Sequence, residues 1–227
     1  MQSIIVLTGA GISAESGIRT FRDSNGLWEE YRIEDVATFE AWEKNSKLVL
    51  DFYNQRRRQL ATVQPNDAHY ALAILEKKYH VQIITQNVDD LHERAGSKKI
   101  LHLHGELTKA RSTLDNDLVY DIGYKDVLLG DKCKKESQLR PHIVWFGEAV
   151  PNIILATSLM QTADIVMIIG TSMNVYPAAG LINHARRNAT KYYIDPDASN
   201  AKSFNNLQVI KEKAGMAVPN LVEKLMQ

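Results

Sequence analysis

The sequence has almost no cysteine and no excess of either charge. Cys133 is the single cysteine among 227 residues, so the chain forms no internal disulfide, which is typical of a reducing compartment. The chain carries 27 basic and 27 acidic residues. Dedicated nucleic-acid-binding proteins normally gather a basic excess on one face, and we therefore expect no specific nucleic-acid partner.

Long hydrophobic runs are missing as well. The longest apolar run after the first strand, Ile165 to Ile169, is far too short to span a bilayer. Only three residues precede the apolar run 4–7, which argues against a signal peptide. We expect a cytoplasmic protein with no membrane partner. Its length allows one large domain, or one domain that carries a smaller insert.

Short apolar runs alternate with helical patterns along the chain. The expected strands are residues 4–11, 81–87, 142–148, 164–172 and 191–195. Most are nearly continuous in apolar residues, as in a parallel sheet that helices cover on both sides. The expected helices are residues 39–61, 67–79, 152–162, 178–188 and 217–226. This alternation predicts an α/β fold with a Rossmann-like parallel sheet and helices on both faces.

Two regions interrupt the alternation. Residues 30–65 are helical and charged, without a strand of their own, and residues 108–140 are polar with short apolar islands. We interpret both as parts of a small domain inserted into a nucleotide-binding domain. The large domain then consists of residues 1–29, 66–107 and 141–227.

A glycine-rich turn follows the first apolar run. In LTGAGISAESG, residues 7–17, Gly9 and Gly11 would let backbone N–H groups approach a pyrophosphate, and a following helix N-terminus would favour its charge. The spacing departs from G-x-G-x-x-G because the third glycine is Gly17. A tight strand-to-helix turn without a ligand is the alternative.

Polar residues follow two further apolar runs. Gln86, Asn87 and Asp89 come after the run 81–84, and Gly170, Thr171 and Ser172 come after the run 165–169. Ligands of open α/β sheets bind at the carboxyl ends of strands, where amide and carboxylate groups suit ribose hydroxyls. Asn87 and Asp89 could instead cap the next helix.

The motif LHLHGE, residues 101–106, holds two histidines. His102 and His104 would share one face if both lay on a strand. The pair could bind a metal. One histidine could instead act as a general base toward a sugar hydroxyl, with the other as a structural partner, or both could be structural.

Three consecutive arginines, Arg56, Arg57 and Arg58, lie in a helical pattern. Tyr53 and Arg56 are three residues apart and share a face of this helix. We expect Arg57 and Arg58 to turn away from that face and to form a solvated surface.

In combination, these motifs resemble those of the sirtuins, the NAD-dependent protein-lysine deacylases. The segments GAGIS, SGIRTFR, TQNVD, HLHGE, PHIVWFGE and GTSMNVYPAAG have the family's order and spacing, from about residue 4 to the C-terminus. Each motif alone is weak, but together in register they are specific. The resemblance implies a Rossmann-like large domain, a small inserted domain, and a cleft between them for acyl-lysine and for NAD, which is consumed as a co-substrate.

The resemblance also implies site residues. His104 matches the catalytic histidine, with Asn87 as a second catalytic residue. In the family, the acyl oxygen attacks C1′ of the nicotinamide ribose, nicotinamide leaves, and the histidine then activates a ribose hydroxyl. The implied NAD-binding residues are Gly9, Ala10, Gly11, Ile12, Ser13, Ala14, Thr20, Phe21, Arg22, Trp28, Gln86, Asn87, Val88, Asp89, Gly170, Thr171, Ser172, Asp195 and Ala214.

The implied partners are proteins with acylated lysines. The substrate peptide would lie as an added strand between two segments, with loose sequence preference. These segments contribute Val144, Trp145, Phe146, Gly147, Val175 and Tyr176. Sirtuins that remove succinyl and malonyl groups share a Tyr-x-x-Arg pair, which here is Tyr53 and Arg56; Thr20 and the small residues Ala14 and Ala37 fit the same subgroup.

One departure from the family is plain. Sirtuins usually hold a structural zinc with four cysteines, but here Cys133 stands alone and Ser112 replaces an expected cysteine. One thiolate without a nearby histidine cannot complete a tetrahedral site, so we predict no zinc and no other metal. The small domain would then depend on apolar packing of Leu114, Leu118, Val119, Tyr120, Ile122, Tyr124, Val127 and Leu128.

The sequence therefore predicts an NAD-dependent deacylase that removes acetyl and acidic acyl groups from lysine, and we expect it to be a monomer. Two alternatives use the same dinucleotide site. One is an NAD-dependent protein ADP-ribosyltransferase, and the other is a non-catalytic protein that binds NAD or ADP-ribose.

Overall fold

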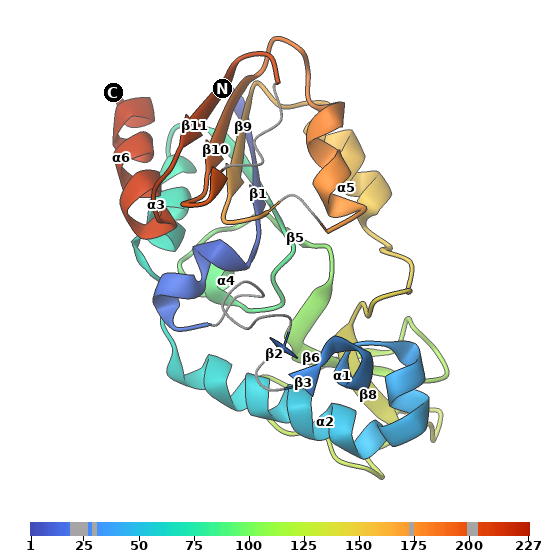
Figure 1. The fold of residues 1–227 in the computed structure, drawn as a ribbon. Coiled ribbons are helices and arrows are strands. Elements are labelled where there is room, and N and C mark those ends of the chain that lie inside the picture. The colour runs from blue at the N-terminus through green and yellow to red at the C-terminus, as the bar shows by residue number, and fades with distance from the viewer. Residues whose placement is uncertain (19–26, 29–30, 173–174, 199–203) are drawn as a thin grey trace.

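A parallel six-stranded sheet forms the upper part of the molecule in Figure 1. The structure is a computed structural model that describes residues 1–18, 27–28, 31–172, 175–198 and 204–227. The strands lie in the order β11-β10-β9-β1-β4-β5, and all of their pairings are parallel. Their bounds are β1 Ser3–Thr8, β4 His80–Thr85, β5 Ile100–His102, β9 Ile165–Ile169, β10 Thr190–Ile194 and β11 Leu207–Ile210. The predicted α/β fold class is confirmed.

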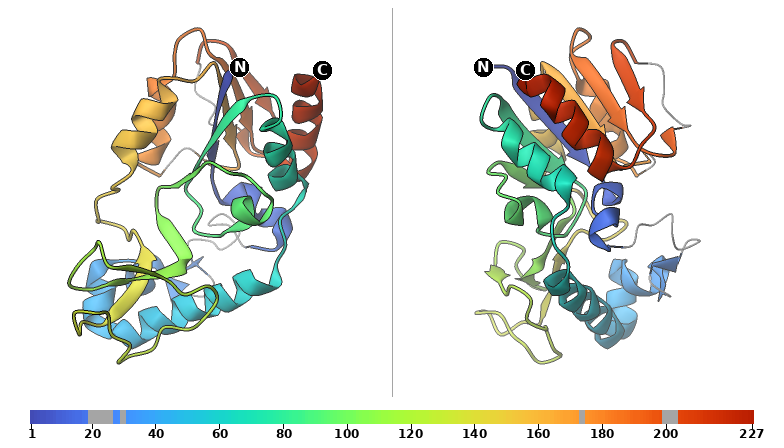
Figure 2. Two further views of the ribbon diagram at one scale, coloured as in Figure 1. Left: turned by 180° about the vertical axis from the view of Figure 1, so that it is seen from behind. Right: turned by 90° about the vertical axis from the view of Figure 1, so that its left-hand side faces the viewer.

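Helices cover both faces of this sheet (Figure 2). Side chains alternate along β1, so Ile4 and Val6 join one apolar core while Ile5 and Leu7 join another. The first core also contains residues of α3, Asp67–Leu75, and α6, Ala214–Met226. The second contains residues of α5, Ile153–Met160, and of the 3-10 helix η3, Ala178–His184. Burial on both faces explains the nearly continuous apolar runs of the sequence.

The lower part of the molecule in Figure 1 combines helices with antiparallel strands. The helix α2, Phe39–Thr62, is capped by Thr38, whose Oγ1 accepts a hydrogen bond from the N–H of Ala41 at 3.0 Å. A three-stranded sheet in the order β7-β6-β8 packs beside it, and a third apolar core lies between them. The remaining bounds are α1 Ile33–Val36, β6 Gly105–Ser112, β7 Val119–Asp121, β8 Leu139–Ile143, α4 Leu91–Arg94, and the short pair β2 Leu27–Trp28 and β3 Tyr31–Arg32.

Three expectations about elements were wrong. The run 142–148 is no strand of the parallel sheet, because β8 ends at Ile143 and pairs antiparallel with β6. Residues 30–65 do contain a strand, β3, and the pattern at 178–188 forms the 3-10 helix η3 instead of an α-helix. An apolar run shows that a segment is buried, but its pairing depends on distant edges that periodicity does not reveal.

The expected apolar packing of residues 108–140 was also largely wrong. Val127 is buried and Ile122 packs partly against the third core, but Leu114 is 71% exposed and Leu128 is 56% exposed. Polar contacts fasten this segment instead. Asn54 makes two hydrogen bonds of 2.9 Å to the backbone of Val127. Among the described residues, no helix is long and apolar enough to cross a membrane.

Candidate active site

A pocket of about 770 Å³ opens where the parallel sheet meets the lower part of the molecule. Residues that follow β1, β4 and β9 line it on one side, and residues of α2 line it on the other. From β1 the chain adds β4 and β5 toward one edge of the sheet, and it later adds β9, β10 and β11 toward the other edge. The order of strands therefore reverses direction between β1 and β9, which is the switch point of the topology. Open α/β sheets bind ligands at such a point.

Two small-residue turns meet at the switch point. The N–H of Gly11 donates to the carbonyl oxygen of Gly170 at 2.8 Å, and the N–H of Gly9 donates to Ile169 at 3.0 Å. A Cβ on Gly170 would lie 2.4 Å from the nitrogen of Ile12, and the φ of Gly170 is +62°, which disfavours other residues. Close packing of the turns therefore requires these glycines. Because glycine has no side chain, backbone groups form this part of the pocket wall.

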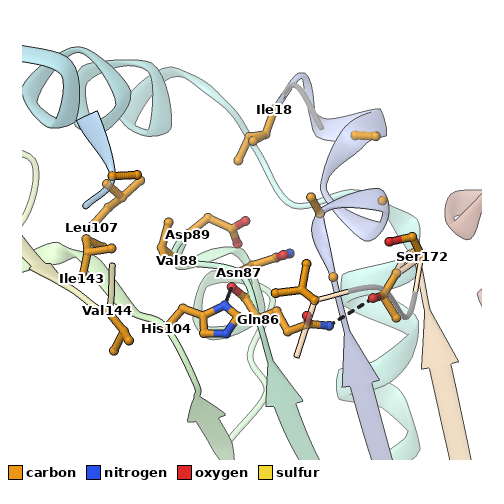
Figure 3. A pocket seen from close by; sticks show the side chains of 18 of the residues that line it. Ile18, Gln86, Asn87, Val88, Asp89, His104, Leu107, Ile143, Val144 and Ser172 are labelled. Atoms are coloured by element: carbon orange, nitrogen blue, oxygen red, sulfur yellow. Dashed lines mark hydrogen bonds between the residues drawn. The ribbon is translucent and has the colours of Figure 1, made fainter. Parts of the chain in front are cut away.

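Asn87 and Asp89 belong to one buried hydrogen-bond network in the pocket wall. Ser13 donates from Oγ to Oδ2 of Asp89 at 2.9 Å and accepts from Nδ2 of Asn87 at 3.1 Å. Asp89 Oδ1 also accepts from the N–H of Leu91 at 3.2 Å, but the N-cap of α4 is Asp90, so the alternative that Asn87 or Asp89 caps the next helix was wrong. Burial raises the pKa of Asp89. Figure 3 shows Asn87 and Asp89 projecting together toward the pocket.

A second buried network lies beneath the same loop. The hydroxyl of Thr8 donates to Oγ1 of Thr85 at 2.8 Å, and Thr85 in turn accepts from the N–H of Asn87 at 3.0 Å. His92 Nε2 lies 3.1 Å from the Thr8 hydroxyl, and its ring packs edge-on against the ring of His69 at 4.9 Å. Burial lowers the pKa of His69 to about 4 and lowers that of His92 well below its ordinary value.

His104 lines the pocket as a neutral imidazole. Its Nδ1 lies 3.1 Å from the carbonyl oxygen of Gln86 (Figure 3). A carbonyl oxygen only accepts, so Nδ1 carries the proton and Nε2 keeps a lone pair. Burial lowers the pKa of His104, although the bond to Gln86 opposes this. The Nε2 atom can therefore accept a proton at neutral pH.

His102 has a different environment, and the condition under which the two histidines would share a strand face is not met. The strand β5 ends at His102, and His104 follows outside it. His102 Nδ1 faces the carbonyl oxygen of Asn87 at 3.0 Å, and Nε2 faces Glu93 at 2.8 Å. Burial alone would lower the pKa of His102, but Glu93 raises it above its ordinary value. The two rings face different partners and form no pair of metal ligands.

The side chains of Tyr53 and Arg56 lie in the α2 wall of the pocket. Tyr53 is fully buried and Arg56 is 6% exposed, and both line the cavity. The indole Nε1 of Trp145 donates to the hydroxyl of Tyr53 at 3.1 Å. Burial raises the pKa of Tyr53, so its hydroxyl keeps its proton. A cation and a neutral hydroxyl thus stand together in this wall.

The expectation that Arg57 is surface charge was wrong. Arg57 is fully buried, and its Nε donates to the carbonyl oxygen of Leu107 at 2.7 Å, while Nη1 donates to Oδ1 of Asn54 at 2.7 Å. On a helix, the residue four positions after Tyr53 lies as close to its face as the residue three positions after it. Arg58 is exposed and pairs with Asp126, as expected of surface charge.

Most of the other predicted site residues line the same pocket. Among them are the residues from the two segments expected beside a peptide, with Phe146 47% and Tyr176 66% exposed. Ile12 and Ser13 instead lie buried behind the wall. Thr20, Phe21 and Arg22 lie outside the described residues, as does the side chain of Trp28. The pocket-lining predicted residues are Gly9, Ala10, Gly11, Ala14, Gln86, Asn87, Val88, Asp89, His104, Val144, Trp145, Phe146, Gly147, Gly170, Thr171, Ser172, Val175, Tyr176, Asp195 and Ala214, with Tyr53 and Arg56.

Sequence reasoning missed an apolar group in the wall of the pocket. Ile18, Leu107 and Ile143 point into it in Figure 3, and Ile33 and Leu60 also line it. Leu60 could have been found, because it follows Arg56 by four residues on the same helix. The others come from separate elements, and only the folded chain brings them together.

Comparisons with known proteins agree with this geometry. A model of the Sir2 family matches residues 9–177. A relative from Helicobacter pylori named NAD-dependent protein deacylase is 60% identical over 227 residues, covering 100% of this chain and 99% of that protein. One of the same name from Bacteroides thetaiotaomicron is 50% identical over 234 residues, covering 100% and 99%. A solved Sir2 homologue–NAD complex has a TM-score of 0.89 at 40% identity, covering 99% of this chain and 89% of that one.

Proposed function

Because the chain belongs to the Sir2 family and is an NAD-dependent protein deacylase, we propose that it removes the acidic acyl groups succinyl and malonyl, as well as acetyl, from protein lysines. The products would be nicotinamide, O-acyl-ADP-ribose and free lysine. The observation that carries the acidic preference is the pair Tyr53 and Arg56 in the pocket wall. A guanidinium can hold a carboxylate with two parallel hydrogen bonds, and a hydroxyl can add a third.

The residues at the switch point fit an NAD co-substrate. The turns at Gly9–Gly11 and Gly170–Ser172 place backbone at the pocket wall without large side chains, which suits a pyrophosphate. When bound, NAD supplies the ribose C1′ that the acyl oxygen attacks. Asn87 and Asp89 would bind on the ribose and nicotinamide side, and Asp195 would bind on the adenosine side.

His104 is the proposed general base. The carbonyl oxygen of Gln86 holds Nδ1–H, which directs the lone pair of Nε2 away from that carbonyl. Because burial lowers the pKa of His104, the ring stays unprotonated at neutral pH and can take a proton from a ribose hydroxyl. We also propose that the lower part around α2 functions as the small domain, which would place the cleft between two domains.

The test compares Arg56→Met with wild type on succinyl-, malonyl- and acetyl-lysine peptides that share one sequence. We expect kcat/KM for the two acidic peptides to fall about 100-fold, since the loss of a charge-assisted pair is worth roughly 3 kcal/mol. The ratio of succinyl to acetyl turnover should fall almost as much. Arg58→Met is the matched control, because Arg58 lies on the solvent side of the same helix.

Two outcomes would count against the proposal. Equal loss of turnover on all three peptides would make Arg56 a structural residue. Stable ADP-ribosyl protein in place of O-acyl-ADP-ribose would identify a transferase of the alternative kind. His104→Tyr should abolish turnover on every peptide, which separates chemistry from acyl recognition.

A further inference from the structure

Trp145 lies beside Tyr53 in the pocket wall, and both residues line the cavity. The indole is 2% exposed, and its Nε1 lies 3.1 Å from the hydroxyl oxygen of Tyr53. An indole N–H can only donate, so the oxygen of Tyr53 must accept this bond. The proton of the Tyr53 hydroxyl therefore points elsewhere, and no acceptor among the described residues takes it.

The hydroxyl proton stays in place because Tyr53 is fully buried. Burial raises the pKa of Tyr53, and the positive charge of Arg56 offsets only part of this effect. Tyr53 is thus a neutral donor beside a cation, rather than a phenolate that would neutralise it. A carboxylate suits this pair, because it accepts both from a guanidinium and from a hydroxyl.

Trp145 is itself held by a partly buried ion pair. Arg140 lies over the indole face, with its Cζ 3.3 Å from the ring centroid, and it is 4% exposed. Glu148 accepts from Nη1 of Arg140 at 2.8 Å and from Nη2 at 3.1 Å. The same carboxylate accepts from the backbone N–H of Trp145 at 2.8 Å. Burial alone would raise the pKa of Glu148, but these donors lower it, so the group is charged.

The ring and the backbone of Trp145 are therefore fixed by one pair, Arg140 and Glu148. A cation over an aromatic face is attracted to it, and here the contact is desolvated. On another side, the ring of Trp42 packs at 5.8 Å from that of Trp145. With the ring held by these contacts, the indole N–H points toward the hydroxyl of Tyr53.

We propose that Trp145 is a positioning residue for acyl selectivity, which orients the hydroxyl of Tyr53 as a donor to the distal carboxylate of an acidic acyl group beside Arg56. This inference rests on the proposed function and gives Trp145 a role other than contact with the peptide. Arg140 and Glu148 act one step further back, by holding the indole. Selectivity then depends on four side chains in successive contact, and only the last of them touches the acyl group. They are Glu148, Arg140, Trp145 and Tyr53.

The test is a double-mutant cycle between Trp145→Phe and Tyr53→Phe. Each change removes one polar group and keeps an aromatic ring. We expect Trp145→Phe to lower the ratio of succinyl to acetyl kcat/KM by about 3- to 10-fold, chiefly by raising the KM for the succinyl peptide, since one neutral hydrogen bond is worth about 1 kcal/mol. Tyr53→Phe should lower the ratio at least as much.

The decisive result is the double variant. If Trp145 acts through Tyr53, then Trp145→Phe changes the ratio no further once Tyr53 is phenylalanine. Independent losses that multiply in the double variant would overturn the inference, as would an unchanged ratio in Trp145→Phe. Trp42→Phe is the matched control, because it removes an indole from the same cluster without a bond to Tyr53; it should leave the ratio unchanged.

Further outcomes separate this inference from the proposed function. A wild-type enzyme that does not turn over succinyl-lysine would sink the proposed acyl preference itself. If Arg56→Met selectively lowers turnover of the acidic peptides but Trp145→Phe leaves the ratio of succinyl to acetyl kcat/KM unchanged, only the role of Trp145 is overturned. If Trp145→Phe does not fold, Arg140→Lys replaces it, because lysine keeps the charge but loses the flat contact with the indole. A ratio that Arg140→Lys leaves unchanged would then overturn the inference.

Discussion

Replacement of the buried Arg57 by leucine tests how the lower part of the molecule is held together. In wild type, Arg57 joins α2 to the carbonyl oxygen of Leu107 at 2.7 Å and also bonds Asn54 of the same helix at 2.7 Å. Asn54 in turn holds the backbone of Val127 through two bonds of 2.9 Å. Arg57→Leu removes the charge and both of its bonds, while Asn54 keeps its contacts with Val127.

The magnitude follows from two opposing contributions. A hydrogen bond from a charged donor is worth roughly 1.5–3 kcal/mol, so the two bonds contribute about 3–6 kcal/mol. Burial lowers the pKa of Arg57 from 12.5 to about 10, and at about 1.4 kcal/mol per pKa unit the buried charge costs about 3 kcal/mol. Leucine also leaves the Leu107 carbonyl without this donor, at about 1–3 kcal/mol. Together these ranges give a net loss of about 1–6 kcal/mol.

Thermal unfolding followed by circular dichroism measures this loss. For a chain of this length, about 1 kcal/mol shifts Tm by roughly 2–4 °C, so Arg57→Leu should lower Tm by about 2–24 °C. Arg58→Leu is the control, since it removes the neighbouring arginine at an exposed position. Equal changes in Tm for the two variants would refute the reasoning, because burial and backbone contacts would then make no difference.

Two further predictions concern pH and metal. The unfolded chain titrates its histidines near pH 6.5, whereas burial lowers the pKa of His69 to about 4 and that of His92 further. At these two sites the unfolded chain therefore binds more protons below pH 6.5, so their contribution to stability in urea should be constant above that pH and fall by about 1.4 kcal/mol per pH unit for each of the two histidines toward pH 4. A flat profile between pH 6.5 and 4.5 would contradict this. Metal analysis of protein produced with added zinc should find far less than stoichiometric zinc, and a chelator should leave Tm unchanged; stoichiometric zinc would show that Cys133 and Ser112 do not exclude the metal.

The sequence predicted the pocket best where one local rule applies. Gly9, Asn87 and Gly170 follow buried strands, and the carboxyl ends of parallel strands meet at one edge of a sheet. Strand ends are visible in a sequence as the point where an apolar run stops. The main features of the pocket wall formed by the ends of the parallel strands were therefore predictable without knowledge of long-range contacts.

The α2 wall and the antiparallel sheet were less predictable, for physical reasons. Helical periodicity places Arg56 and Arg57 at similar angles from Tyr53, and only the position of Leu107, on a distant strand, makes Arg57 buried. Leu114 and Leu128 look like core residues in the sequence, yet both are exposed. Polar contacts such as those of Asn54 fasten this region, and hydrophobic patterns do not reveal them.

Neighbouring side chains in one stretch of α2 have different roles because they point in different directions. Tyr53 and Arg56 line the pocket, Asn54 and Arg57 hold neighbouring backbone, and Gln55 is exposed. The proposed acyl recognition and the anchorage of the helix are thus interleaved in five consecutive residues but use separate contacts. The anchoring bonds of Asn54 and Arg57 do not involve the side chains of Tyr53 and Arg56. A new acyl preference could therefore arise by two substitutions, without the helix first losing its hold on the rest of the chain.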